Sequence, residues 1–154
     1  ITLNIKNKLM IGIDNKGQIS AEYLLLIVVL LLIMATVTIP LVGRSIDASN
    51  DISWASDANI AVDSIVNAVN IVYSNGPNSK RSLNFYIPET MNFQTNGKTV
   101  SLSVVLSNGK THYVNSTTNY PMNANNQVLT KGKWYNATIT WNSRSNINVN
   151  VIAA

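Results

Sequence analysis

The chain has 154 residues, enough for one ordinary domain with a buried core, and its net charge is +4. It contains no Cys and one His, which excludes a disulfide framework, a thiolate or His-rich metal site and a cysteine nucleophile. Charged residues make up only 12% of the chain, about half their usual share, and 23 Asn, 15 Ser and 12 Thr take their place. Because the basic residues are scattered singly, we expect no nucleic-acid partner.

Residues 23–43 form an uncharged and mostly aliphatic segment. A helix needs about 20 such residues to cross the roughly 30 Å hydrocarbon core of a bilayer. The alternative is a buried helix of a soluble domain, but a segment that is apolar on all sides needs more surrounding protein than this chain supplies. We therefore predict a membrane-spanning helix. Lys6, Lys8 and Lys16 precede it, which places the N-terminal side in the cytoplasm and the rest of the chain outside.

The residues just before the apolar segment have the character of a cleavage site. A secretory signal peptide would be cut after its apolar run, but the sequence that follows Ile39, PLVGRSI, is a poor small-x-small site. Residues 16–26 instead read KGQISAEYLLL. Here a charged leader ends in Gly17, and the hydrophobic helix that follows would survive cleavage.

This segment resembles the class III signal peptide of archaeal type IV pilins over residues 14–40. The resemblance implies that a prepilin peptidase cuts between Gly17 and Gln18, so that residues 1–17 are a leader and Gln18 is the mature N-terminus. It also implies a pilus assembly machinery as a partner. Archaellins share the leader, but the Gln-x-Ser-x-Glu order favours the pilin branch.

Glu22 lies at the edge of the aliphatic helix, where a carboxylate is costly unless it is paired. One interpretation is an interfacial Glu that faces lipid headgroups. The other is a role in assembly, in which Glu22 of one subunit meets the new amine of Gln18 in a staggered neighbour. A buried charge without a partner costs several kcal/mol, so this pair would select one register of packing.

The helix is expected to extend over residues 18–74. Pro40 removes one backbone hydrogen bond and should bend the helix or open it locally. From residue 55 onward, apolar residues recur every three or four positions, which predicts an amphipathic helix with one face in a core, ending near Gly76. The expected core positions are Ala55, Ala58, Val62, Ile65, Val69 and Val72.

Residues 75–154 change to the period of two that is typical of strands. We expect strands at 82–87, 99–106, 110–115, 133–141 and 146–152, and turns at 96–97, 108–109, 131–132 and 142–145. The Asn-rich stretch 115–127 is interpreted as a surface loop or an extra edge segment. The predicted fold is therefore α+β: a long N-terminal helix followed by a small antiparallel β head, as a sheet, barrel or sandwich packed on the second half of the helix.

No catalytic constellation can be assembled from these residues. His112 lies on a predicted strand without an arguable Ser or Asp partner, and the four Asp between residues 47 and 63 scatter round the helix. Trp54, Trp134 and Trp141 are better explained as core or subunit-contact aromatics than as carbohydrate contacts. We expect no enzymatic activity, no cofactor and no metal site.

Two Asn-x-Ser/Thr sequons lie in the predicted head, at Asn115 and Asn136. A head outside the cell makes both of them candidates for glycosylation. Asn115, next to the Asn-rich stretch, is the better candidate.

These features favour a structural protein, the major subunit of an archaeal adhesive pilus, in which the apolar helices bundle in the filament core and the β heads lie outside. The subunit would wait in the membrane after cleavage and exchange lipid for neighbouring helices on assembly. The alternatives are a monomeric membrane-anchored binding domain at the cell surface and a minor or priming pilin.

Overall fold

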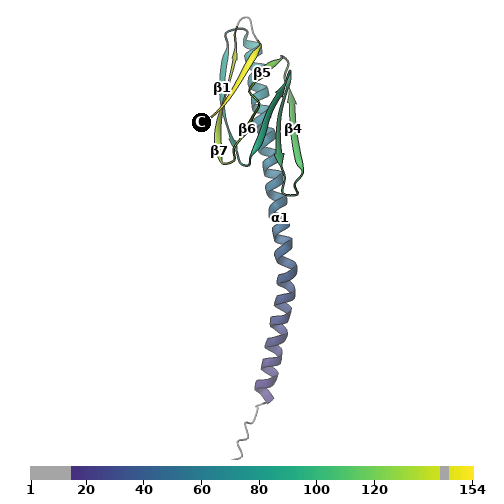
Figure 1. Cartoon of the computed structure of the whole chain (residues 1–154). Coiled ribbons are helices and arrows are strands. Elements are labelled where there is room, and N and C mark those ends of the chain that lie inside the picture. Colours follow the sequence, from purple (N-terminus) through teal and green to yellow (C-terminus); the bar gives the residue numbers. More distant parts are fainter. Residues whose placement is uncertain (1–14, 143–145) are drawn as a thin grey trace, which may run out of the picture. The chain divides into compact units, whose positions relative to one another are not determined.

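The computed structural model describes residues 15–142 and 146–154 (Figure 1). Residues 1–14 of the predicted leader, with Lys6 and Lys8, and residues 143–145 of the last predicted turn lie outside these ranges. The described chain is α+β, as predicted, with one long N-terminal helix, α1 (Asn15–Asn75), followed by strands in two sheets. It divides after Ser45 into two compact units, and α1 contributes to both.

In the N-terminal unit, the side chains of α1 are exposed from residue 20 to residue 45, except for a half-buried Ala35. The most apolar window of the helix has a mean hydropathy of 3.0 and is not buried at all, so by length and composition the helix can cross a membrane. The helix continues through Pro40 without a break. Of the two effects expected at Pro40, a bend or a local opening, the opening is therefore not seen. Proline removes a single backbone donor, and the surrounding turns keep their own hydrogen bonds.

The part of α1 in the C-terminal unit, residues 46–75, is amphipathic as predicted. Five of the six expected core positions are buried, and only Ala55 is half-buried. The helix ends where Gly76 adopts a φ of +85°, a left-handed conformation that glycine takes without strain. The Ser79 hydroxyl lies 2.7 Å from the carbonyl oxygen of Val72 and 2.6 Å from that of Gly76, so it can donate to an acceptor that the end of the helix leaves free.

The head contains two four-stranded sheets. The first has the order β1-β7-β8-β5 and the second the order β4-β3-β2-β6, and every pairing is antiparallel except that of β5 with β8. The bounds are β1 (Lys80–Ile87), β2 (Met91–Asn96), β3 (Thr99–Val105), β4 (Thr111–Thr117), β5 (Met122–Ala124), β6 (Gln127–Leu129), β7 (Lys133–Trp141) and β8 (Ile147–Ala153).

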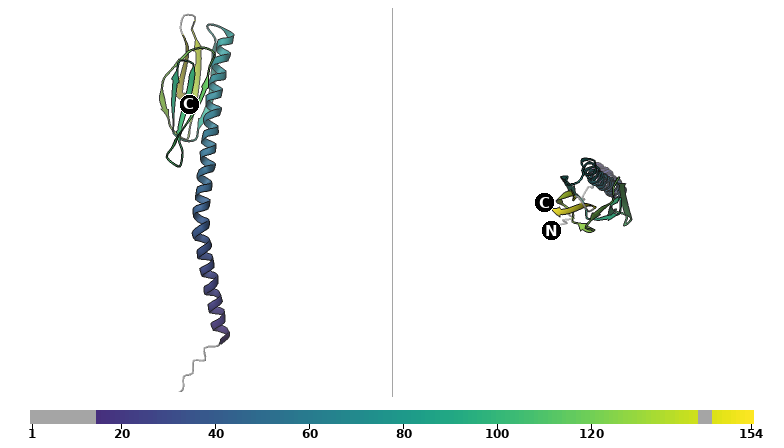
Figure 2. Two further views of the ribbon diagram at one scale, coloured as in Figure 1. Left: turned by 90° about the vertical axis from the view of Figure 1, so that its right-hand side faces the viewer. Right: turned by 90° about the horizontal axis from the view of Figure 1, so that it is seen from above.

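The two sheets and the C-terminal turns of α1 share one hydrophobic core. Figure 2 shows these turns of the helix lying along the strands. Each element contributes the apolar residues of one face, as the alternating burial of β3 and β7 illustrates. The largest fully buried side chains come from all three layers: Ile65 from α1, Phe93 and Leu102 from the second sheet, and Ile139 and Ile147 from the first.

The five predicted strands correspond to β1, β3, β4, β7 and β8, with ends shifted by up to two residues. Three strands were missed, namely β2, β5 and β6. Of these, β5 is an edge strand within the Asn-rich stretch, which agrees with an extra edge segment there. The turns predicted at Asn-Gly and Lys-Gly pairs are confirmed at Gly97, Gly109 and Gly132, each with a positive φ.

Candidate functional site

The exposed aliphatic surface of residues 23–43 is the most unusual feature of the chain. Its Leu, Ile, Val and Met side chains are between 39% and 71% exposed. A soluble monomer rarely exposes a continuous apolar patch of more than a few hundred Å², so a surface of this kind marks contact with a membrane or with other protein. Since the segment is apolar on all sides, contacts are needed all round the helix.

Cleavage is predicted between Gly17 and Gln18, and both residues lie near the start of α1, which begins at Asn15. Ser20 and Glu22 lie further along the same helix, and both are exposed. Gln18 and Glu22 are four residues apart, so these two positions share one face of the helix. The first turn of α1 holds no acidic residue, and only cleavage before Gln18 would bring Glu22 close to a helix N-terminus, where the helix dipole favours a carboxylate. The arrangement places an acidic group at the start of the aliphatic surface and next to the position where cleavage would create an amine.

Among the described residues, no ion pair or side-chain hydrogen bond satisfies Glu22. Its carboxylate is therefore available to a group from outside this chain. In water an exposed carboxylate needs no partner, whereas in a dry environment it does. Whether Glu22 becomes paired thus depends on what surrounds the helix.

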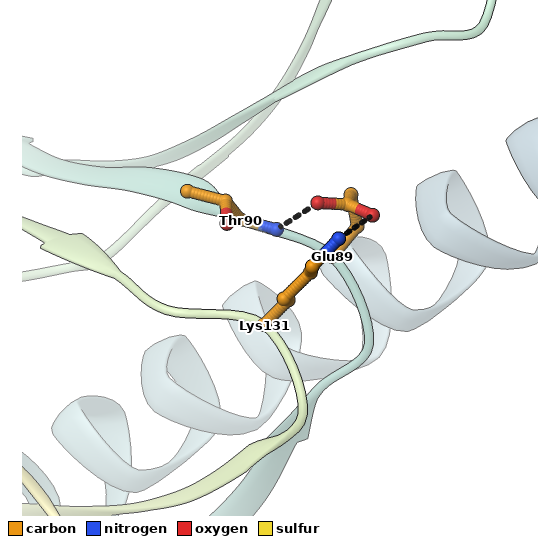
Figure 3. Close-up of polar contacts among 3 residues, drawn as sticks. All are labelled: Glu89, Thr90 and Lys131. Atoms are coloured by element: carbon orange, nitrogen blue, oxygen red, sulfur yellow. Dashed lines mark hydrogen bonds and ion pairs between the residues drawn. The ribbon is translucent and has the colours of Figure 1, made fainter.

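An ion pair at the surface of the head joins Lys131 to Glu89. The Nζ of Lys131 lies 3.8 Å from Oε2 of Glu89, whose other oxygen accepts a 2.9 Å hydrogen bond from the backbone N–H of Thr90 (Figure 3). The Lys131 side chain is 65% exposed, so solvent screens this pair and it contributes little stability. The part of the chain that the structure describes has no group of three or more His, Asp or Glu side chains that could hold a metal ion.

Two of the three tryptophans are core contacts, as predicted. Trp54 packs partly buried against the core, and Trp141 lies in an aromatic cluster with Tyr73 and Tyr120, at centroid distances of 5.6 and 5.3 Å. Trp134 differs, because it is 57% exposed and lies beside the half-exposed Tyr86, 5.5 Å away. This exposed pair was not identified from the sequence as distinct from the core aromatics.

The two sequons both lie on strands. Asn115 is exposed on β4, an edge strand of its sheet, whereas Asn136 is half-buried on β7 inside the other sheet. The Nδ2 of Asn136 donates a 2.7 Å hydrogen bond to Oδ1 of Asn84, and the hydroxyl of Thr138 donates to Oδ1 of Asn136 at 3.0 Å. The acceptor asparagine of the second sequon is thus already held in a defined orientation.

Comparison with models of known protein families matches residues 15–41 to the class III signal peptide, the signature of archaeal type IV pilins and prepilins. The resemblance drawn from KGQISAEYLLL is therefore confirmed. A signal peptide of this class implies processing by a prepilin peptidase and assembly in association with the membrane. The match covers the N-terminal segment alone. No curated protein and no solved structure matched the chain.

Proposed function

We propose that the chain is a structural subunit of an archaeal adhesive type IV pilus and that it polymerises through its N-terminal helices. The observation that carries this proposal is the combination of a class III signal peptide with an aliphatic helix whose surface is exposed from residue 23 to residue 43. A membrane alone would be enough to cover this surface, so the exposed helix by itself does not distinguish a permanent anchor from a pilin. The class of the signal peptide favours the pilin, whose helix is later withdrawn from the membrane into a filament.

The proposed pathway begins with cleavage between Gly17 and Gln18 by a prepilin peptidase. The mature subunit remains in the membrane, with residues 23–43 in lipid and the head outside. On assembly the aliphatic surface exchanges lipid tails for the helices of neighbouring subunits, so little apolar area meets water. The head has no catalytic task in this proposal and needs no cofactor; it forms the outer surface of the filament.

The proposed role of Glu22 is to fix the register between subunits. In the filament interior its carboxylate would pair with the Gln18 amine of a neighbouring chain, and two charges would be neutralised together. Any other register would leave both groups buried without partners. Breaking a buried pair by removing one partner costs about 3–5 kcal/mol, which makes the penalty for a wrong register large.

Electron microscopy of cells that produce Glu22→Gln tests the proposal. This variant keeps the size of the side chain and removes its charge, so we expect normal cleavage but few or no filaments. Asp47→Asn is the matched control, because Asp47 is exposed on the same helix outside the signal peptide match, and it should leave filaments intact. Abundant Glu22→Gln filaments would contradict the pairing role. Wild-type cells that carry the cleaved protein only as a membrane-bound monomer would favour the anchored binding domain instead.

A further inference from the structure

Two exposed aromatic side chains of the head share the same relation to a sequon. Tyr113 on β4 is 64% exposed and precedes Asn115 by two residues, and Trp134 on β7 is 57% exposed and precedes Asn136 by two residues. These are the only two sequons in the sequence. The same spacing of aromatic residue and asparagine therefore occurs at both of them.

Strand geometry places each aromatic ring and its asparagine on one face. Alternate side chains of a strand point to the same side, and residues two apart are separated by about 7 Å. On β7 the intervening residues Tyr135 and Ala137 are buried, so Trp134, Asn136 and Thr138 face outward together. On β4 only Val114 is buried, and Tyr113, Asn115 and Thr117 are all exposed.

Tyr113 and Trp134 are more than half exposed, so much of the apolar surface of each ring is left in contact with water. A pyranose ring has one face made of C–H bonds, and this face packs well on an aromatic ring. A sugar on Nδ2 of the asparagine can reach back over the preceding aromatic on the same side of the strand. The first sugar would then cover an apolar surface that the protein otherwise leaves exposed.

The hydrogen bonds at Asn136 are compatible with such a modification. Its Nδ2 has two hydrogens and donates to Oδ1 of Asn84, the cross-strand partner on β1. Glycosylation replaces one hydrogen, and the other can still make this bond. Tyr86 is the cross-strand partner of Trp134, with ring centroids 5.5 Å apart, so it widens the aromatic surface beside the acceptor.

We propose that Asn115 and Asn136 are N-linked glycosylation sites in which Tyr113 and Trp134 form stacking platforms for the first sugar. In the transfer step, Nδ2 bonds to the anomeric carbon of a lipid-phosphate-linked oligosaccharide. The bond from that carbon to the phosphate oxygen breaks, the lipid phosphate leaves, and one amide proton passes to a base of the transferring enzyme. The inference needs the head outside the cell, as the proposed function has it, but it does not need a filament.

This inference revises the preference for Asn115 over Asn136. Asn136 is half-buried, but Trp134 on the same face of β7 is largely exposed, so this face is open to solvent beside the acceptor. A groove of about 250 Å³ lies beside Trp134, with Asn84 and Tyr86 from β1 and Ile60 and Ser64 from α1 in its lining. Both sites should therefore be occupied.

The test compares the protein purified in detergent from the organism that makes it with the chain from Gln18 onward, produced in a bacterium without a sequon glycosyltransferase. Mass spectrometry of the peptides around Asn115 and Asn136 should find a glycan on each in the first preparation only. The glycosylated protein should have the higher Tm, by about 4 °C.

The double variant Tyr113→Ala with Trp134→Ala tests the platforms. In this variant the difference in Tm between the two preparations should largely disappear. Val128→Ala, which removes an exposed apolar side chain away from both sequons, should preserve it.

Unmodified asparagines in protein from the native organism would overturn the sites. Glycans that raise the Tm equally with and without the two aromatic residues would overturn the platforms. Electron microscopy of the same preparation separates this inference from the pilus proposal. Filaments with bare asparagines contradict only the glycan sites, and a glycosylated protein that forms no filaments contradicts only the pilus.

Discussion

The carboxylate of Asp51 accepts two hydrogen bonds from Ser107, one from the backbone N–H and one from the hydroxyl, both at 2.8 Å. Asp51 lies on α1, and Ser107 lies in the turn between β3 and β4, 56 residues further along the chain. Both residues belong to the C-terminal unit. The contact therefore fixes the tip of the β3–β4 hairpin to the helix that carries the core, outside the core itself.

Replacing Asp51 by Ala should lower the free energy of unfolding of the head by about 1 kcal/mol. Hydrogen bonds to a charged group contribute more than this when buried, but solvent screens this partly exposed pair. Thermal unfolding followed by near-UV circular dichroism measures the effect. Asp63→Ala, at an exposed position on the face of the helix away from the core, is the control and should change the Tm little. Equal effects of the two changes would contradict the anchoring role.

Ile65→Ala should destabilise the head far more than Ile60→Ala. Ile65 is fully buried in the core, and its truncation removes apolar contacts and leaves a cavity, at a cost of about 2–5 kcal/mol. Ile60 is on the same helix but is 61% exposed, so the same change should cost well under 1 kcal/mol. Thermal unfolding of the two variants side by side gives the comparison. Similar melting temperatures would show that the helix does not pack on the sheets through the Ile65 face.

Gly76→Ala should cost about 1 kcal/mol, because Gly76 has a φ of +85° and a Cβ makes this conformation unfavourable. Nothing lies within 4 Å of the position that a Cβ would take, so the cost comes from the backbone and not from a clash. Gly76→Asn should be milder, since Asn tolerates left-handed conformations better. A larger loss for Asn than for Ala would point to a steric cause instead.

The size of residue 17 should decide whether the leader is removed. We expect Gly17→Phe to accumulate as uncleaved precursor in the membrane, because a bulky side chain would not fit a peptidase site shaped for glycine. Gly17→Ala should be cleaved at least in part. Immunoblotting of membranes separates precursor from mature protein by size. Normal cleavage of Gly17→Phe would place the processing site elsewhere.

The sequence predicted those parts of the fold whose signals are local. The aliphatic segment, the core face at Ala58 to Val72 and the glycine turns each follow from a few neighbouring residues. The strand β2 was missed because Met91 and Phe93 are its only large apolar residues, too few to establish a period of two. The three-residue strands β5 and β6 are too short for any period, and their pairing with β8 and β2 depends on contacts distant in sequence.

The candidate site also has a part that the sequence predicts and a part that only the structure shows. The cleavage motif is contiguous, so Gly17, Gln18 and Glu22 could be singled out from the sequence alone. Trp134 and Trp141 lie seven residues apart on β7, so the two-residue period of a strand already places them on opposite faces. The apolar residues Tyr135, Ala137 and Ile139 share the face of Trp141, and this alternation could have identified Trp134 as the exposed one. The platform at Tyr113 has no such signal, because Val114 is the only aliphatic residue of β4.

The pilin role proposed above can be tested through the intact mass and N-terminal sequence of the subunit in filaments purified from the cells that make it. We expect this chain to be the filament subunit, with Gln18 as its first residue. A filament subunit that still carries residues before Gln18, or purified filaments that lack this chain, would contradict it.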